Sequence, residues 1–297
     1  MMRRALLRAL CCISFVVCAL SAHGEPLPAG ISRRVVDIGG TAIEVHFYKP
    51  AHYDKGPLLV SFHGLSRDME SYLDAARAIA ERHGMLLVMP LFDRQRFPYW
   101  RYQGLGITRT SRTITSGPIA VEPPAQWTGA LILKLIDHVR NDEGRPALDY
   151  YLIGHSAGGQ VVNRFAALVP NSAKRMVVAN PSSYVRPARQ ARFPYGFGDL
   201  PENMADESAI RRYLAQPITI LLGTADLLTR NLDLLPPAMQ QGATRYERGR
   251  NAFHAAQELA RDNGWEFNWR LVEVPGVGHD AQGMYRSPQA EAALFGR

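Results

Sequence analysis

The sequence has few cysteines, few lysines and no apolar run long enough to cross a membrane. Its three cysteines, Cys11, Cys12 and Cys18, all lie within the first 24 residues. Once those residues are removed, the chain can form no disulfide and has no cysteine nucleophile or thiolate metal site. Only four of its 34 basic residues are lysines, and the arginines are scattered rather than gathered in a dense run. We therefore expect no nucleic-acid partner.

Residues 1–24 have the charged, apolar, small-residue order that is typical of a secretory signal peptide. Arg3, Arg4 and Arg8 precede an apolar run at 10–20, which is shorter than the roughly 20 residues that a membrane-spanning helix needs. We predict cleavage after Gly24 or Ser21, export to the periplasm or the medium, and no membrane span in the mature chain. A buried N-terminal helix is the alternative. Loss of the three arginines would lower the formal net charge from +7 to +4.

The rest of the chain has the composition of a folded globular protein. It is 46% hydrophobic and 21% charged, which excludes a disordered or collagen-like chain. No repeat, low-complexity block or long polar linker divides it. We therefore predict a single domain over residues 25–297, and the sequence leaves its oligomeric state open.

Short apolar runs bounded by glycine or proline alternate with amphipathic stretches. Runs of this kind indicate parallel strands buried on both faces; they lie at 58–62, 85–89, 150–153, 176–179, 218–222 and 271–274, and 42–48 alternates like a strand exposed on one face. Helical periodicity covers 69–82, 127–139 and 161–169. The alternation predicts the α/β class, with a mostly parallel sheet covered on both faces by helices in right-handed crossovers.

The segment Gly154-His155-Ser156-Ala157-Gly158 is the main candidate for chemistry. It follows a buried strand and opens a helix, which is the setting of a nucleophile elbow. In such an elbow the serine occupies a strained turn, and glycines at positions such as Gly154 and Gly158 avoid a collision across it. The alternative is an ordinary serine in a glycine-rich turn.

A serine hydroxyl is a poor nucleophile and needs a base that is itself oriented by a carboxylate. Asp226 comes just after the strand at 218–222, and His279 just after the strand at 271–274. Taken singly, each has an alternative, Asp226 as a turn-forming residue and His279 as an ordinary loop histidine. Together, the order Ser156, Asp226, His279 and the three strand-end positions predict a catalytic triad.

Acyl transfer also needs hydrogen-bond donors for the developing oxyanion, usually backbone N–H groups. We expect one from Ala157, at the start of the helix after the serine, and the other from Leu65. Gly64 allows the backbone to turn just before Leu65. We interpret His63 as a residue that braces this loop rather than as a second base.

These features together resemble the α/β-hydrolase superfamily over nearly the whole chain after residue 24. The sequence is most similar to its secreted polyester-depolymerase-like and esterase-like branches, although it has a single His63-Gly64 pair where many lipases have a longer glycine run, and it lacks the disulfides common in those branches. The resemblance implies a serine hydrolase that cleaves a small-molecule or polymeric carboxylic ester through an acyl-enzyme, with no metal or organic cofactor. A peptidase or thioesterase with the same triad, and a non-catalytic binding protein of this fold, are the alternatives.

Three segments are longer than a minimal crossover. We predict that 180–217 forms a small cap-like insertion, whereas 92–124 is a loop rich in aromatic residues. Loops at the carboxyl ends of parallel strands form the ligand crevice, so we expect four aromatic residues near the substrate: Tyr99, Trp100, Tyr102 and Tyr184. The alternative is that they only pack the loops down. In the third segment, 241–260, Arg245 and Arg248 either pair with nearby acids or bind a substrate carboxylate.

Overall fold

The computed structural model describes residues 24–109 and 118–296, so the predicted signal peptide, apart from Gly24, lies outside the described residues. The strands are β1 (Gly30–Asp37), β2 (Ala42–Lys49), β3 (Leu58–Phe62), β4 (Leu86–Leu91), β5 (Tyr150–His155), β6 (Arg175–Ala179), β7 (Ile218–Gly223) and β8 (Arg270–Val274). The helices are α1 (Met69–His83), the 3-10 turn η1 (Pro124–Gln126), α2 (Thr128–Asp142), α3 (Ala157–Leu168), α4 (Glu202–Ala205), α5 (Glu207–Leu214), α6 (Pro236–Met239), α7 (Arg245–Asn263), α8 (Ala281–Arg286) and α9 (Pro288–Phe295).

The strands form one eight-stranded sheet in the order β1-β2-β4-β3-β5-β6-β7-β8. The six strands from β4 to β8 in this order are parallel, and β1 and β2 add an antiparallel edge. This confirms the predicted α/β class with a mostly parallel sheet. The seven predicted strands all form. β1 was not predicted, because most of its positions are only partly buried or exposed.

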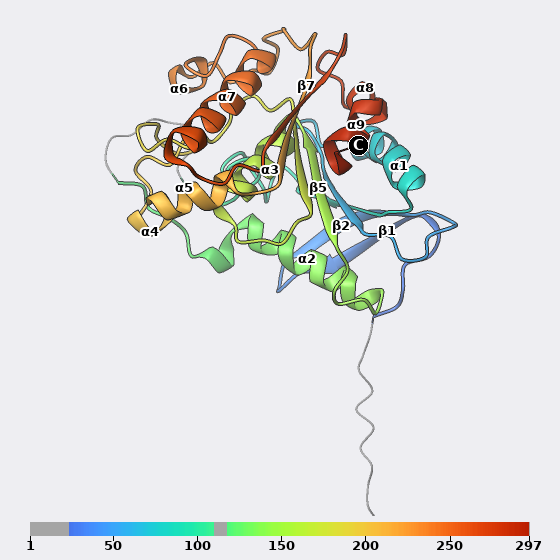
Figure 1. The fold of residues 1–297 in the computed structure, drawn as a ribbon. Coiled ribbons are helices and arrows are strands. Elements are labelled where there is room, and N and C mark those ends of the chain that lie inside the picture. The colour runs from blue at the N-terminus through green and yellow to red at the C-terminus, as the bar shows by residue number, and fades with distance from the viewer. Residues whose placement is uncertain (1–23, 110–117, 297) are drawn as a thin grey trace, which may run out of the picture.

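Helices cover both faces of the sheet, as Figure 1 shows. Helices α1, α8 and α9 lie on one side, and α2, α3, α5 and α7 lie on the other. Each face has its own apolar core, so the central strands are covered twice. All residues of β3 and β7 are buried. This double burial explains why the parallel strands read as continuous apolar runs in the sequence.

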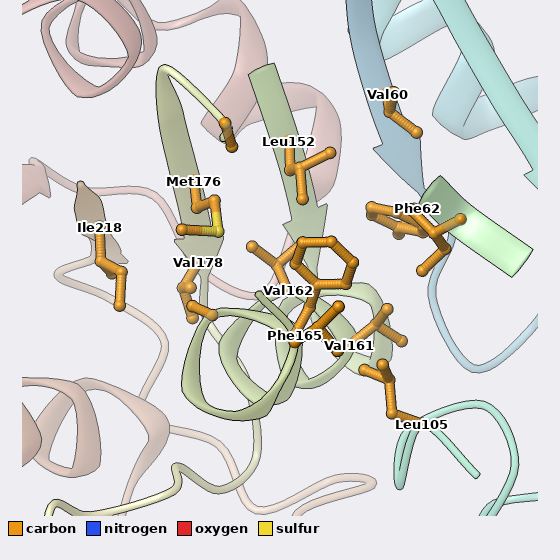
Figure 2. Close-up of a cluster of buried hydrophobic side chains, with 14 of the residues drawn as sticks. Val60, Phe62, Leu105, Leu152, Val161, Val162, Phe165, Met176, Val178 and Ile218 are labelled. Atoms are coloured by element: carbon orange, nitrogen blue, oxygen red, sulfur yellow. The ribbon is translucent and has the colours of Figure 1, made fainter. Parts of the chain in front are cut away.

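The helix that follows the serine is anchored firmly to the sheet. Figure 2 shows Val161, Val162 and Phe165 of α3 facing strand side chains that include Phe62 and Leu152. All five side chains have no measurable exposure. The start of α3, and with it Ser156, is therefore fixed by close packing rather than by its loop alone.

Helix α7 begins and ends on standard signals. The Thr244 hydroxyl accepts a hydrogen bond from the Glu247 N–H at 3.1 Å, which caps the first turn. The helix ends at Gly264, which has a φ of 64° in the left-handed region that glycine tolerates. The first turn of α7 packs behind the end of β7 and carries two buried arginines, Arg245 and Arg248.

The carboxyl ends of the parallel strands lie along the same edge of the sheet. The register pairs Gly154 of β5 with Val178 of β6, and Gly223 of β7 with Val274 of β8. Segments that follow these strands in the sequence are far apart along the chain but adjacent in space. This edge brings together the predicted site residues.

Candidate active site

Ser156 lies in a sharp turn between β5 and α3. Its φ of 59° and ψ of −118° are sparsely populated for a residue with a side chain. Its N–H donates to the Ala179 carbonyl at 2.9 Å, which ties the turn to β6. A Cβ on Gly154 would lie 2.2 Å from the Gly158 carbonyl oxygen, and one on Gly158 would lie 2.2 Å from that of Phe62. Both glycines therefore occupy positions where the backbone segments approach too closely for a side chain.

The three predicted triad residues form one hydrogen-bonded chain. Ser156 Oγ lies 2.9 Å from His279 Nε2, and His279 Nδ1 lies 2.7 Å from Asp226 Oδ2. An ionised carboxylate only accepts hydrogen bonds, so the Nδ1–H donates to Asp226 and Nε2 is left to accept from the serine hydroxyl. This arrangement can draw a proton from Ser156 and hold the resulting imidazolium against a carboxylate.

The three hydrogen-bonded side chains differ in how deeply they are buried. The Asp226 side chain is fully buried, whereas the His279 side chain is 26% exposed. Ser156 and His279 open into a cavity of about 720 Å³. The residues that line it include Leu65, Tyr99, Ala157 and Ser182. The reacting atoms are thus accessible to a ligand, while the acid is shielded from water.

Both predicted oxyanion donors lie at this cavity. Leu65 follows β3 in the loop beside the serine, and Ala157 is the first residue of α3. The first N–H groups of a helix have no partner within the helix. Within residues 24–109 and 118–296, neither the Leu65 nor the Ala157 N–H donates to a backbone acceptor. Both are therefore available to a carbonyl oxygen bound in the cavity.

His63 braces the loop that carries Leu65. Its Nδ1–H donates to the Gly64 carbonyl at 3.0 Å, and its Nε2 accepts from the Phe92 N–H at 3.1 Å. Its ring stacks on Tyr102 with centroids 4.6 Å apart. Burial lowers the pKa of His63 to about 3. The ring is therefore neutral at ordinary pH and is fully engaged with the backbone.

The low pKa of His63 predicts a loss of stability in acid. The folded state binds no proton at His63 above about pH 3, whereas the unfolded chain takes one up below about pH 6.5. The free energy of unfolding should therefore fall as the pH drops from 6.5 towards 3, by up to about 1.4 kcal/mol per pH unit from this group. Urea unfolding at several pH values should give a shallower dependence for His63→Asn than for the unmodified protein. An equal slope in the two proteins would contradict this account.

The aromatic residues expected near the substrate do not all lie there. Tyr99 lines the cavity, whereas Trp100 is partly buried and does not line it. Tyr102 and Tyr184 have no exposed surface, so the prediction that they contact substrate is wrong. The Tyr102 hydroxyl instead donates to the His63 carbonyl at 2.7 Å, beneath the Leu65 loop. The sequence placed these residues near the correct edge of the sheet but could not give the direction of their side chains.

The predicted cap-like insertion, 180–217, contributes little surface to the cavity. It holds α4 and α5, and α5 packs against α3. Among its residues, Ser182 lines the cavity. All five aromatic side chains in this segment are buried.

Two residues that the sequence analysis did not single out contact the His279 side of the site. The His155 ring lies 4.6 Å from that of His279, and the Tyr72 hydroxyl lies 3.1 Å from His155 Nδ1. Burial, followed by the charge of His279, holds the pKa of His155 well below its ordinary value. Tyr72 has the helical spacing of an ordinary core residue, so no sequence signal marked it.

Residues 24–109 and 118–296 contain neither a metal-binding cluster nor a membrane-spanning helix. No group of three His, Cys, Asp or Glu residues there could hold a metal ion. No helix there is both long enough and apolar enough to cross a membrane.

Comparison with known proteins defines the class. No family model and no curated protein matches the sequence. The poly(3-hydroxybutyrate) depolymerase LpqC from Bordetella parapertussis is 32% identical, with a TM-score of 0.80 over 91% of this chain and 92% of that one. Poly(aspartic acid) hydrolase-1 from Sphingomonas sp. KT-1 is 30% identical, with a TM-score of 0.80 over 89% of this chain and 98% of that one.

A more distant structure agrees with this fold. The S-formylglutathione hydrolase from Agrobacterium tumefaciens is 16% identical, with a TM-score of 0.52 over 88% of this chain and 91% of that one. The protein is thus an α/β-hydrolase. Within that family, the chain belongs to the branch of esterases and depolymerases.

Proposed function

We propose that this protein is a serine hydrolase that cleaves carboxylic esters through an acyl-enzyme, with Ser156, His279 and Asp226 as its catalytic triad. The observation that carries the proposal is the chain of contacts at 2.9 and 2.7 Å that joins the three side chains at the cavity. The strained backbone at Ser156 supports it, because such conformations persist where a function requires them.

In the proposed reaction, Ser156 Oγ attacks the ester carbonyl carbon while His279 Nε2 takes the hydroxyl proton. The carbonyl oxygen becomes an oxyanion that accepts hydrogen bonds from the Leu65 and Ala157 N–H groups. Collapse of this intermediate breaks the bond to the alcohol oxygen, which receives the proton from His279. Water then attacks the acyl-enzyme with His279 again as the base, and the acid and free Ser156 are released. Asp226 keeps the imidazole in the Nδ1–H form throughout.

We further propose an aliphatic ester or polyester chain as the substrate. Leu65 lines the cavity, and Leu227 and Leu228 directly follow Asp226; all three side chains are exposed, by 43%, 53% and 72% respectively. Leu65 offers apolar contact to an acyl chain at the cavity, and Leu227 and Leu228, which do not line the cavity, would offer it only to a longer chain that extends beyond it. The named activity of the Bordetella depolymerase, on poly(3-hydroxybutyrate), is consistent with this choice.

Amide hydrolysis is the second candidate, because the Sphingomonas relative is named as a hydrolase of poly(aspartic acid). Thioester hydrolysis would use the same triad. A panel that compares kcat/KM for 3-hydroxybutyrate oligomers, a short-chain thioester and aspartate oligomers separates these reactions. We expect the ester to be cleaved with the highest kcat/KM. Faster cleavage of the amide or the thioester would overturn the ester assignment, and binding without turnover would favour a non-catalytic protein.

We also propose that the protein is exported and that residues 25–297 form the mature domain. The charged and apolar order of residues 1–24 supports this. Mass measurement of the protein recovered from the periplasm and the medium should give a chain that begins at Glu25 or Ala22. An intact Met1 in protein recovered only from the cytoplasm would contradict export.

A further inference from the structure

Arg245 is buried directly behind the predicted catalytic acid. The side chains of Arg245 and Asp226 are 1% and 0% exposed, and Arg245 Nη1 lies 3.4 Å from Asp226 Oδ1. The two carboxylate oxygens therefore have different partners, because Oδ2 accepts from His279 and Oδ1 faces the guanidinium. A substrate carboxylate in the cavity could not reach Arg245, which does not line it.

The same guanidinium holds the loop that follows the acid. Arg245 Nη1 donates to the Leu228 carbonyl at 3.1 Å, and Nη2 donates to the Arg230 carbonyl at 2.6 Å. The next residues, Asn231 and Leu232, line the cavity. Arg245 is thus connected both to the acid and to one wall of the cavity.

We propose that Arg245 is a positioning residue that compensates the charge of the buried Asp226 carboxylate and holds that carboxylate towards His279. This inference rests on the proposed function. A carboxylate without exposed surface is strongly destabilised unless a cation or several donors compensate its charge. Among the described residues, no arginine or lysine other than Arg245 forms an ion pair with Asp226.

Arg245 and His279 share one carboxylate. An imidazolium at His279 would be a second cation beside the carboxylate that Arg245 already faces. Two further groups face this cluster. The His155 ring lies 4.6 Å from that of His279 with the two planes tilted by 38°. The charge of Asp226, after burial, helps to raise the pKa of Tyr184 well above its ordinary value. At neutral pH both are uncharged, which leaves Arg245 as the compensating charge.

Arg248 provides a contrast one turn further along α7. Its side chain is also fully buried, but its Nε donates to the Gly242 carbonyl at 2.8 Å and its Nη1 to the Asp233 carbonyl at 2.9 Å. Its Nη1 also donates to the Ser182 carbonyl. Arg248 therefore bonds to backbone carbonyls as a structural cross-link does, although the charge of the buried Asp233 carboxylate also acts on it. Arg245 differs because its guanidinium faces the predicted catalytic acid.

The test is the pH dependence of kcat/KM for a soluble ester, 4-nitrophenyl acetate, between pH 4.5 and 8. Arg245→Met removes the cation, so His279 should keep its proton to higher pH. The acid limb of the kcat/KM profile should therefore move to higher pH by about one unit. Arg245→Lys should restore most of that shift, although it cannot bond to both loop carbonyls. The control is Arg250→Met on the same helix, since Arg250 is partly exposed and pairs with Glu273 at 2.7 Å. Its profile should not move.

A folded Arg245→Met protein with an unshifted acid limb would overturn the proposal, even if its kcat were lower. If Arg245→Met does not fold, the double variant R245M/D226N decides, because no unpaired charge then remains buried. We expect this double variant to fold and to be more stable to urea than D226N alone. Lower stability of the double variant would show that Arg245 is only a cross-link and would also overturn the proposal. An unmodified protein that hydrolyses no ester would instead count against the proposed function, and the urea comparison would still test the pairing.

Discussion

Ser156→Ala is expected to lower kcat for ester hydrolysis by roughly 10⁴- to 10⁶-fold while the protein stays folded. The reason is that Ser156 Oγ is the hydroxyl that His279 Nε2 contacts, at 2.9 Å, at the cavity. Alanine occupies nearly the same volume, and the backbone of the turn remains tied to Ala179 through the residue's own N–H. Steady-state hydrolysis of 4-nitrophenyl acetate, with circular dichroism to check the fold, measures this loss.

Ser208→Ala is a suitable control for this substitution. Ser208 is exposed on α5, and its hydroxyl donates to Asp206 at 2.8 Å, away from the cavity. We expect its rate to equal that of the unmodified protein. A folded Ser156→Ala protein that kept most of its activity would mean that another group supplies the nucleophile.

Asp226→Asn should lower kcat by about 10⁴-fold. The amide would present N–H donors or a neutral oxygen to His279 Nδ1 in place of a carboxylate. An amide N–H that donates to Nδ1 forces the proton onto Nε2, and His279 could then no longer accept the proton of Ser156. The substitution also leaves Arg245 buried without its anion, so the variant should be less stable to urea as well.

Kinetics at pH 7 to 8 measure the loss of activity and urea unfolding measures the loss of stability, with Asp262→Asn as the control. Asp262 is exposed at the end of α7 and pairs with Arg261 at 2.8 Å. Its variant should be as active and as stable as the unmodified protein. If Asp226→Asn kept full activity in a folded protein, Asp226 could not be the residue that orients His279.

The parallel strands could be predicted because burial on both faces leaves them almost wholly apolar. Strands β3 and β7 are buried at every position, so they read as nearly continuous apolar runs in which Ser61 and Thr219 are the polar residues. The edge strand β1 differs, because Ile31 and Val35 are 58% and 70% exposed and arginines separate them. Its formation depends on pairing with β2, a tertiary feature that local sequence does not encode.

The closeness of the three proposed triad residues could be predicted because each follows a predicted strand, and parallel strands end at one edge of the sheet. The residues that surround them could not be predicted. The sequence offered either a nearby acid or a substrate as the partner of Arg245, and the partner proved to be Asp226, 19 residues earlier. The direction of the Tyr102 and Tyr184 side chains depends on loop packing, which leaves no periodic trace. The prediction that these two side chains contact substrate failed for this reason.

The most direct test of the central claim, that Ser156 is an activated nucleophile, is labelling with a fluorophosphonate followed by mass mapping. The account predicts one adduct on the purified mature protein, on the peptide that contains Ser156, and none on the Ser156→Ala variant. No adduct on folded protein, or an adduct on a different residue, would contradict it.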